Sequence, residues 1–288
     1  MPPRAPFRLS GTQTGLRVLG PTDLPALLDL VSRDPVIHLF AEFRARTTDL
    51  DRRRLAGEFW GYVEDGELVS ACHAGANLVP VEATEAALDA FAARAIVQGR
   101  HCATIVGPLG QVRGLWDRVK PSWAPARAFR WHQPHLELAR QVQVAPDPLV
   151  RITTLADLDA VYPACVAMHT EELGVSPEAG GSSMYRARVS QLIEKRWSFA
   201  RIEQGKVLFK AEVASVTEHA CQVQGVYVDP AHRGQGLATA GMAAVAEYAR
   251  HEIAPIVSLY VNEHNLPARR AYEKVGFVQT AEFGTVMF

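Results

Sequence analysis

The two halves of the sequence repeat one order of local patterns. Each half opens with a short apolar strand, a turn and a capped helix, over residues 16–31 in the first half and 150–168 in the second. Each half then carries two apolar runs joined by a tight-turn dipeptide, Asp65-Gly66 or Gln204-Gly205, which predicts a β-hairpin. The matching order at similar spacing indicates an internal duplication, although strand, helix and hairpin also follow one another by chance.

The length and the position of two prolines predict two domains. A chain of 288 residues, 48% of them hydrophobic, is long enough for two modest cores. Pro146 and Pro148 lie in a stretch without apolar periodicity, which is typical of an exposed linker. We therefore expect one domain over residues 1–145 and a second over residues 149–288.

Charge and cysteine usage exclude several classes of protein. The net charge of −1 gives no global field that attracts nucleic acid or an anionic membrane, so neither is an expected partner. No apolar stretch is long enough to span a bilayer. The four cysteines are far apart and suit buried, reduced thiols in a cytoplasmic protein. No metal site is expected.

A glycine-containing loop follows a β-rich run in the second half. Residues 222–228 form the run, Asp229-Pro230 ends it, and an apolar helical pattern continues to about His251. The first amides of a helix lack internal partners and carry partial positive charge, so a phosphate group can accept their hydrogen bonds. Gly234 and Gly236 allow a close approach of the backbone. By itself this pattern predicts phosphate binding, with a plain helix-capping turn as the alternative.

A second pattern follows about 30 residues later in the chain. An uncharged strand over residues 256–261 precedes a helix that runs to about Val275, where Gly276 is suited to end it. Asn265, Ala268 and Tyr272 are spaced by three and four residues and share one face of this helix. On spacing alone, the alternative for Tyr272 is simple packing of an amphipathic helix.

The two patterns together resemble the acyl-CoA signatures of the GNAT acetyltransferase superfamily. The resemblance rests on Arg-x-x-Gly-x-Ala after Val-Tyr-Val and on the run from Leu259 to Phe277, and it covers about residues 149–288. It implies an α/β (α+β) fold of two tandem GNAT-like domains, each a mixed, mostly antiparallel sheet flanked by helices. It also implies acetyl-CoA as cosubstrate and an amine of a small molecule or protein as the acceptor. The cofactor-binding residues it implies are Val226, Tyr227, Val228, Arg233, Gly234, Gln235, Gly236, Leu237, Ala238, Asn265, Ala268 and Tyr272.

The resemblance gives Tyr272 the role of general acid but leaves the base open. A phenol of pKa about 10 is protonated at neutral pH and can protonate the leaving thiolate. Many family members carry a glutamate on the strand before the phosphate loop, where this chain has Gln222 and Gln224. Glu172, before a loop rich in glycine and serine, is the first candidate base. The further candidates are Glu171, Glu212, His219, the terminal carboxylate of Phe288, and a water chain with no dedicated base.

The first half departs further from the family pattern. Residues 76–81, the counterpart of the phosphate region, lack the Arg-x-x-Gly-x-Ala pattern, and no tyrosine occupies the position of the acid. The half is similar to a degenerate GNAT-like domain, as in two-domain actinobacterial-type proteins. Three tryptophans and two arginines suggest an aromatic-basic surface, with buried packing of the tryptophans as the favoured alternative: Trp116, Trp123, Trp131, Arg127 and Arg130.

Two other functions remain open at this point. The second domain can bind acetyl-CoA without catalysis and report its level to a partner, which would explain the missing glutamate. Alternatively, the chain transfers another acyl or aminoacyl group, although the nearly neutral net charge disfavours a tRNA partner. The pattern is compatible with a monomer or a homodimer.

Overall fold

The computed structural model describes residues 14–179 and 181–288, which form two compact units. The first unit contains the described residues up to His135 together with Thr280–Phe288, and the second contains Leu136–Gln279. The C-terminal residues 280–288, expected in the second domain, thus cluster with the first unit. Residues 1–13 of the expected first domain and Gly180 of the expected loop lie outside the described residues.

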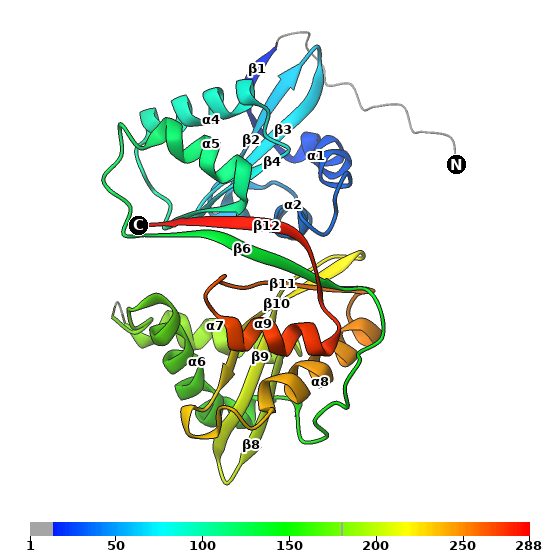
Figure 1. Ribbon diagram of the computed structural model, residues 1–288. Helices are drawn as coiled ribbons and strands as arrows, with labels where there is room; N and C mark the ends of the chain where they lie inside the picture. The colour runs from blue at the N-terminus through cyan, green and yellow to red at the C-terminus, as the bar shows by residue number, and fades with distance from the viewer. Residues whose placement is uncertain (1–13, 180) are drawn as a thin grey trace. The chain divides into compact units, whose positions relative to one another are not determined.

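The first unit is a mostly antiparallel sheet with helices on both faces (Figure 1). Its strands follow the order β1-β2-β3-β4-β5-β12-β6, in which β4 and β5 pair in parallel. The strands are β1 (Gly15–Leu19), β2 (Glu58–Glu64), β3 (Glu67–Ala74), β4 (Asn77–Val81), β5 (Thr104–Pro108), β6 (Ala128–Leu138) and β12 (Val278–Met287). The helices are η1 (Pro21–Asp23), α1 (Leu24–Val31), α2 (Leu39–Thr48), α3 (Arg52–Leu55), α4 (Glu85–Gln98) and α5 (Leu109–Val119).

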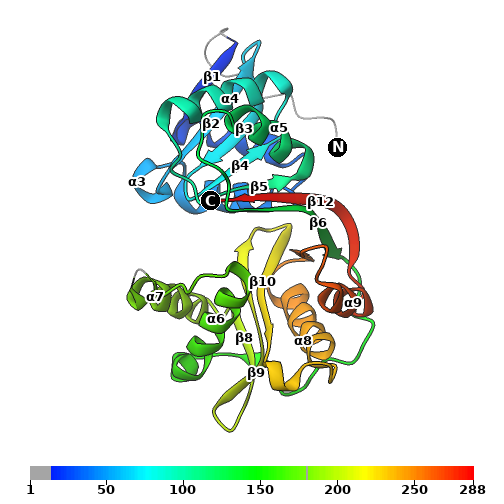
Figure 2. The same cartoon turned by 60° about the vertical axis from the view of Figure 1, so that its left-hand side comes forward.

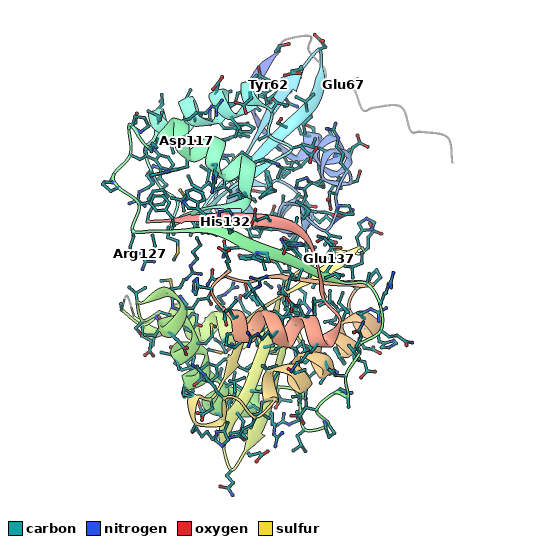
Figure 3. All side chains as sticks on the ribbon, in the orientation of Figure 1. Tyr62, Glu67, Asp117, Arg127, His132 and Glu137 are labelled. Atoms are coloured by element: carbon teal, nitrogen blue, oxygen red, sulfur yellow. The ribbon has the colours of Figure 1, made fainter. Side chains whose placement is uncertain are left out.

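Alternating side chains of β2 pack into two separate hydrophobic cores of the first unit. Phe59 belongs to a core with residues of α1 and α2, whereas its neighbour Trp60 belongs to a core with residues of α4 and α5. Successive side chains of a strand point to opposite faces, so a strand covered on both faces is apolar throughout. Tyr62 and Glu67 lie on the β2–β3 hairpin (Figure 3).

The second unit has the same architecture. Its strands follow the order β11-β10-β9-β8-β7, and β10 and β11 pair in parallel. The strands are β7 (Arg151–Ile152), β8 (Ser198–Glu203), β9 (Lys206–Val216), β10 (Ala220–Val228) and β11 (Ile256–Tyr260). The helices are η2 (Leu155–Asp157), α6 (Leu158–Leu173), α7 (Ser182–Glu194), η3 (Pro230–His232), α8 (Leu237–Glu252) and α9 (Leu266–Val275). Figure 2 shows α6 and α7 on one face of the sheet and α8 on the other.

The predicted hairpins are both present with the turn geometry that their sequences favour. Asp65 and Gly66 have φ of 50° and 82°, and Gln204 and Gly205 have φ of 49° and 77°. Two successive positive φ angles match the right-handed twist of the flanking strands. The expected fold class is therefore confirmed, and the strand order β1-β2-β3-β4-β5 of the first unit recurs as β7-β8-β9-β10-β11 in the second. The helix predicted to run from about residue 155 begins as η2 and ends later than expected, at Leu173.

The four cysteines are buried free thiols, as expected. None of the helices in the described part of the chain is long and apolar enough to cross a membrane.

Candidate functional site

The strand before the glycine loop diverges from its parallel neighbour. β10 and β11 pair at Ala220↔Ile256, Cys221↔Val257 and Gln222↔Ser258, and within the described residues this ladder goes no further. On its other edge β10 pairs with β9, with a register shift between Gln224 and Tyr227. Gly225 lies in this bulge with φ of 61°. A glycine inside a strand pattern is a sequence signal for a bulge, and here it marks the divergence.

The three residues predicted to hold the cofactor arm follow the bulge. Val226, Tyr227 and Val228 are half-buried at the end of β10. Tyr227 packs towards the core under α6 and α7, whereas Val226 and Val228 pack against the core under α8 and α9. The backbone of this segment therefore lies where β10 has already separated from β11.

The loop from Arg233 to Ala238 has the conformation of an anion-binding helix start. Gly234 and Gly236 have φ of 76° and 84°, and Gly236 is the N-cap of α8 without a side-chain cap. Within the described chain, the amides of residues 234–238 donate no hydrogen bond to a protein atom. A Cβ built on Gly234 or Gly236 would meet no atom within 4 Å. Open space thus faces a set of unpartnered amides at the positive end of a helix dipole.

Arg233 is held by a carboxylate of α6. Its guanidinium donates to both oxygens of Glu171, at 3.0 and 2.7 Å, and its Nε donates to the carbonyl of Val228 at 3.2 Å. The hydrogen bonds from Arg233 to Glu171 raise the pKa of this arginine. Glu171, a candidate base in the sequence, is therefore engaged in an ion pair in this structure.

Asp229 binds several donor groups at the start of the loop. It accepts hydrogen bonds from His232 Nδ1 at 2.8 Å and from the amide of Ala231 at 3.1 Å, and it pairs with Lys206 at 2.8 Å. The hydrogen bonds from Lys206 and then from His232 lower the pKa of Asp229 to about 2. The turn that leads into the loop is thus fixed by an ionised carboxylate, a contact that the Asp-Pro dipeptide alone did not reveal.

The helix of the second signature begins with Asn265 as its N-cap. The Asn265 side-chain oxygen accepts a hydrogen bond from the amide of Ala268 at 3.2 Å, so the side-chain nitrogen is the group left to donate to a ligand. Ala268 is half-buried against the core. Gly276 ends the helix with φ of 112°, and its amide donates to the carbonyl of Tyr272 at 3.2 Å, as the sequence predicted.

Tyr272 is buried near a carboxylate of α6. The residue is 6% exposed, and its ring packs against Phe277. Burial and then the negative charge of Glu172 raise the pKa of the phenol, so it keeps its proton at neutral pH. Glu172 is exposed on the last turn of α6. The predicted acid and the first candidate base therefore lie within electrostatic reach of each other.

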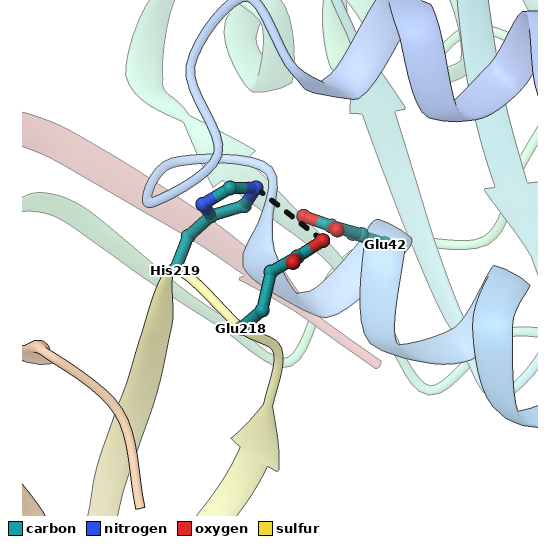
Figure 4. A group of neighbouring side chains, drawn as sticks. All are labelled: Glu42, Glu218 and His219. Carbon is teal, nitrogen blue, oxygen red and sulfur yellow. Dashed lines mark ion pairs between the residues drawn. The ribbon is translucent and has the colours of Figure 1, made fainter.

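The remaining candidate bases lie on other elements. His219 lies in the turn before β10, at the end of that strand remote from the loop, and pairs with Glu218 at 3.8 Å (Figure 4). Phe288 belongs to the first unit, where its ring packs against Trp116 and Trp123. Glu212 is 7% exposed and lies inside the second unit on β9.

A buried polar network on β9 and β10 was not foreseen from the sequence. Lys210 is fully buried and donates to Glu212 at 3.1 Å, and the Gln224 side-chain nitrogen donates to the other oxygen of Glu212 at 3.1 Å. Burial alone lowers the pKa of Lys210, but the charge of Glu212 outweighs it and the net pKa is raised. The signal available in the sequence was the pair Lys210 and Glu212, spaced by two and flanked on both sides by apolar residues.

The tryptophans of the first unit pack rather than form an open aromatic surface. Trp116, Trp123 and Trp131 are half-buried against the core under α4 and α5. The guanidinium carbon of Arg113 lies 5.1 Å from the centroid of the Trp131 ring. From the sequence, Arg127 and Arg130 were the arginines expected beside the tryptophans instead. On β6, His132 Nδ1 contacts Glu282 of β12 at 2.9 Å (Figure 3).

Two family models match the chain. Residues 188–277 match the acetyltransferase (GNAT) family, and residues 57–161 match a domain of unknown function (DUF4081). A mycothiol acetyltransferase from Brachybacterium faecium is 32% identical over 123 residues, which cover 40% of this chain and 37% of that relative. The match therefore spans well under half of the relative's length.

Solved structures with the same fold cover nearly the whole chain. A GCN5-related N-acetyltransferase from Sphaerobacter thermophilus has a TM-score of 0.61 at 17% identity and covers 94% of this chain and 95% of its own. A tandem GNAT protein from the clavulanic acid biosynthesis pathway has a TM-score of 0.56 at 14% identity, with 96% and 98% covered. A GNAT-family acetyltransferase from Colwellia psychrerythraea has the same TM-score at 15% identity, with 95% and 99% covered. At these identities the likeness concerns the fold.

Proposed function

We propose, on the premise that the C-terminal domain of this chain belongs to the acetyltransferase (GNAT) family, that the chain transfers an acetyl group from acetyl-CoA to an amine. The observation that carries the proposal is the set of unpartnered amides in the Arg233–Ala238 loop, next to open space and at the start of a long helix. We assign the activity to residues 149–288.

The residues of the second unit fit the parts of acetyl-CoA. The amides of residues 234–238 suit the pyrophosphate, because it accepts several hydrogen bonds and is negatively charged. Arg233 adds positive charge once it exchanges Glu171 for a phosphate oxygen. The diverging backbone of Val226, Tyr227 and Val228 suits the amides of the pantetheine arm, and the Asn265 side-chain nitrogen supplies a further donor.

The chemistry divides between Tyr272 of α9 and Glu172 of α6. Acetyl-CoA supplies the acetyl group as a thioester when bound. Tyr272 holds a proton at its phenol oxygen, and burial keeps the phenol neutral, so that it can donate this proton to the departing thiolate. Glu172, on the last turn of α6, is our proposed acceptor of the proton that the amine loses. Glu172 is exposed, so the proton it takes can pass on to solvent.

The proposed acceptor is an amine of a small molecule or a protein. The one curated relative described above is a mycothiol acetyltransferase, which supports an amine acceptor but matches over only 37% of that relative. The acceptor probes should therefore differ in class: glycinamide for an α-amine, glucosamine for an amino sugar, 1,4-diaminobutane for an alkylamine, and a lysine-containing peptide.

The test is turnover by the full chain. Purified protein is incubated with acetyl-CoA and each probe, while release of the CoA thiol and the mass of the acetylated product are followed. We expect thiol release that depends on at least one amine, and acetyl-CoA binding by calorimetry. Binding without amine-dependent release would instead support a non-catalytic acetyl-CoA sensor, and no binding would refute the proposal.

A further inference from the structure

Gln224, on β10 just before the bulge, carries a side-chain amide with a defined orientation. The Gln224 side-chain nitrogen donates to Glu212 Oε1 at 3.1 Å. An ionised carboxylate only accepts hydrogen bonds, so the amide nitrogen, and not the oxygen, must face Glu212. The Gln224 side-chain oxygen is thereby turned away from Glu212, and no described residue donates a hydrogen bond to it.

Glu212 is itself fixed, so the orientation of Gln224 is fixed with it. Its second oxygen accepts from the ammonium of Lys210 at 3.1 Å, and Lys210 is completely buried. Glu212 also fills the space beside the bulge, because a Cβ built on Gly225 would lie 2.9 Å from its carboxyl carbon. A buried ion pair that is fully hydrogen-bonded holds its members in one geometry. Lys210, Glu212 and Gln224 thus act as one rigid unit at the bulge.

The group formed by Lys210, Glu212 and Gln224 lies on the face of the sheet that α6 and α7 cover. Val223, the neighbour of Gln224, points into the core under α8, so Gln224 points to the opposite face. Helix α6 packs on both β9 and β10 and carries Glu172 on its last turn. Gln224 and the helix that carries the candidate base are therefore on the same side of the sheet.

We propose that the side-chain oxygen of Gln224 accepts a hydrogen bond from the acceptor amine and orients it for attack. The proposal rests on the proposed acetyl transfer and deepens it by naming the residue that binds the acceptor. The amine nitrogen forms its bond to the acetyl carbon while the carbon–sulfur bond breaks. The amine proton passes to Glu172, and the sulfur takes the proton of Tyr272. Gln224 exchanges no proton and acts only as a hydrogen-bond acceptor.

The test separates acceptor binding from CoA binding. Gln224→Leu removes the amide at similar size, and steady-state kinetics with glycinamide, glucosamine and 1,4-diaminobutane are measured at saturating acetyl-CoA. We expect the KM for the accepted amine to rise about tenfold, because one hydrogen bond to the amine is lost. The Kd of acetyl-CoA should stay within about twofold. Gln191→Leu, at an exposed position of α7, is the matched control and should change neither value.

A second variant tests the role of Glu212 in orienting the amide. Glu212→Gln alone leaves Lys210 as an uncompensated buried charge, so it is combined with Lys210→Met to keep the interior neutral. The double variant should raise the KM for the amine by a smaller factor than Gln224→Leu, with the pH profile of kcat unchanged. A lower kcat with a shifted pH profile and an unchanged KM would make Glu212 the base and overturn the proposal.

The outcomes distinguish this proposal from the proposed function. Unchanged kinetics in Gln224→Leu, with an active wild-type protein, would refute the assignment of Gln224 alone. Absence of turnover of every probe by the wild-type protein would refute acetyl transfer to these amines and the acceptor site with it.

Discussion

The two units contain the same strand–loop–helix segment, but they differ in whether the amides at the helix start have hydrogen-bond partners. In the second unit the loop after β10 leaves the amides of residues 234–238 unpartnered within the described chain. In the first unit, after β4, the amide of Ala83 donates to Gln111 at 3.0 Å and that of Thr84 donates to Ser70 at 3.2 Å. The Thr84 hydroxyl then caps the amide of Ala87 at 3.2 Å.

The two loops also differ in the charge of their side chains. The loop of the first unit carries Glu82, which contacts His38 at 2.8 Å, and Glu85 begins the helix. Side-chain oxygens of Gln111, Ser70 and Thr84 thus accept the amide hydrogen bonds that a phosphate would accept, and two carboxylates lie nearby in the sequence. A shared topology is therefore neutral with respect to cofactor binding. The function of each copy depends on whether side chains of the protein already satisfy the amides at the helix start.

The largest expected effect is the loss of turnover in Tyr272→Phe. If Tyr272 is the general acid, removal of its hydroxyl should lower kcat by about 10²-fold or more, because the thiolate then leaves without a positioned proton. The Kd of acetyl-CoA, measured by calorimetry, should change less than about threefold. Tyr62→Phe on β2 of the first unit is the matched control and should leave kcat unchanged. Equal activity of both variants would mean that Tyr272 only packs.

The fold was predictable from the sequence to a greater extent than the site. Local rules placed the hairpins, because Asp65-Gly66 and Gln204-Gly205 favour one turn geometry in any context. They also placed the end of α9 at Gly276. The partners of Glu171 and Glu212 were not predictable, because Arg233 and Lys210 are brought to them by tertiary packing. Pairing across elements leaves no periodic trace in the chain.

The second prediction concerns acid stability, where the two units should also differ. His73 and His135 are buried in the first unit, and burial lowers the pKa of each to about 4. An unfolded histidine titrates near 6.5, so between pH 6.5 and about 4 the unfolded chain binds protons that the folded unit does not. The first unit should lose about 3 kcal/mol per histidine over this range, and its stability should be greatest above pH 6.5.

Hydrogen exchange of the full chain at pH 7 and pH 5 measures this loss unit by unit. Amides of β2–β4 should lose protection on acidification before those of β8–β10. His73→Leu should reduce the number of protons taken up on unfolding by about one, since one of the two histidines is removed. The same pH dependence in His73→Leu and in the wild-type protein would show that another group controls acid unfolding.

The third prediction concerns the glycines of the loop. Gly236→Val places a β-branched side chain at φ of 84° and fills the open space beside the amides. Acetyl-CoA binding should weaken by about tenfold or more. A β-branched residue at positive φ costs about 1–2 kcal/mol, and relief of this strain turns the loop amides away from the phosphate that they would bind. Gly99→Val is the matched control, since Gly99 of the first unit has φ of 76° and equally open surroundings. Calorimetry should show weakened binding in the first variant only.

The smallest expected effect is the removal of a cap in the first unit. Thr84→Ala takes away the acceptor of the Ala87 amide and should cost about 1 kcal/mol of stability, measured by denaturant unfolding. The freed amide should nevertheless gain no affinity for CoA. The amides of Ala83 and Thr84 keep their partners, and the charges of Glu82 and Glu85 still repel a phosphate at this helix start. CoA binding at a second site in this variant would show that a single cap, and not the whole set of side chains, separates the two copies.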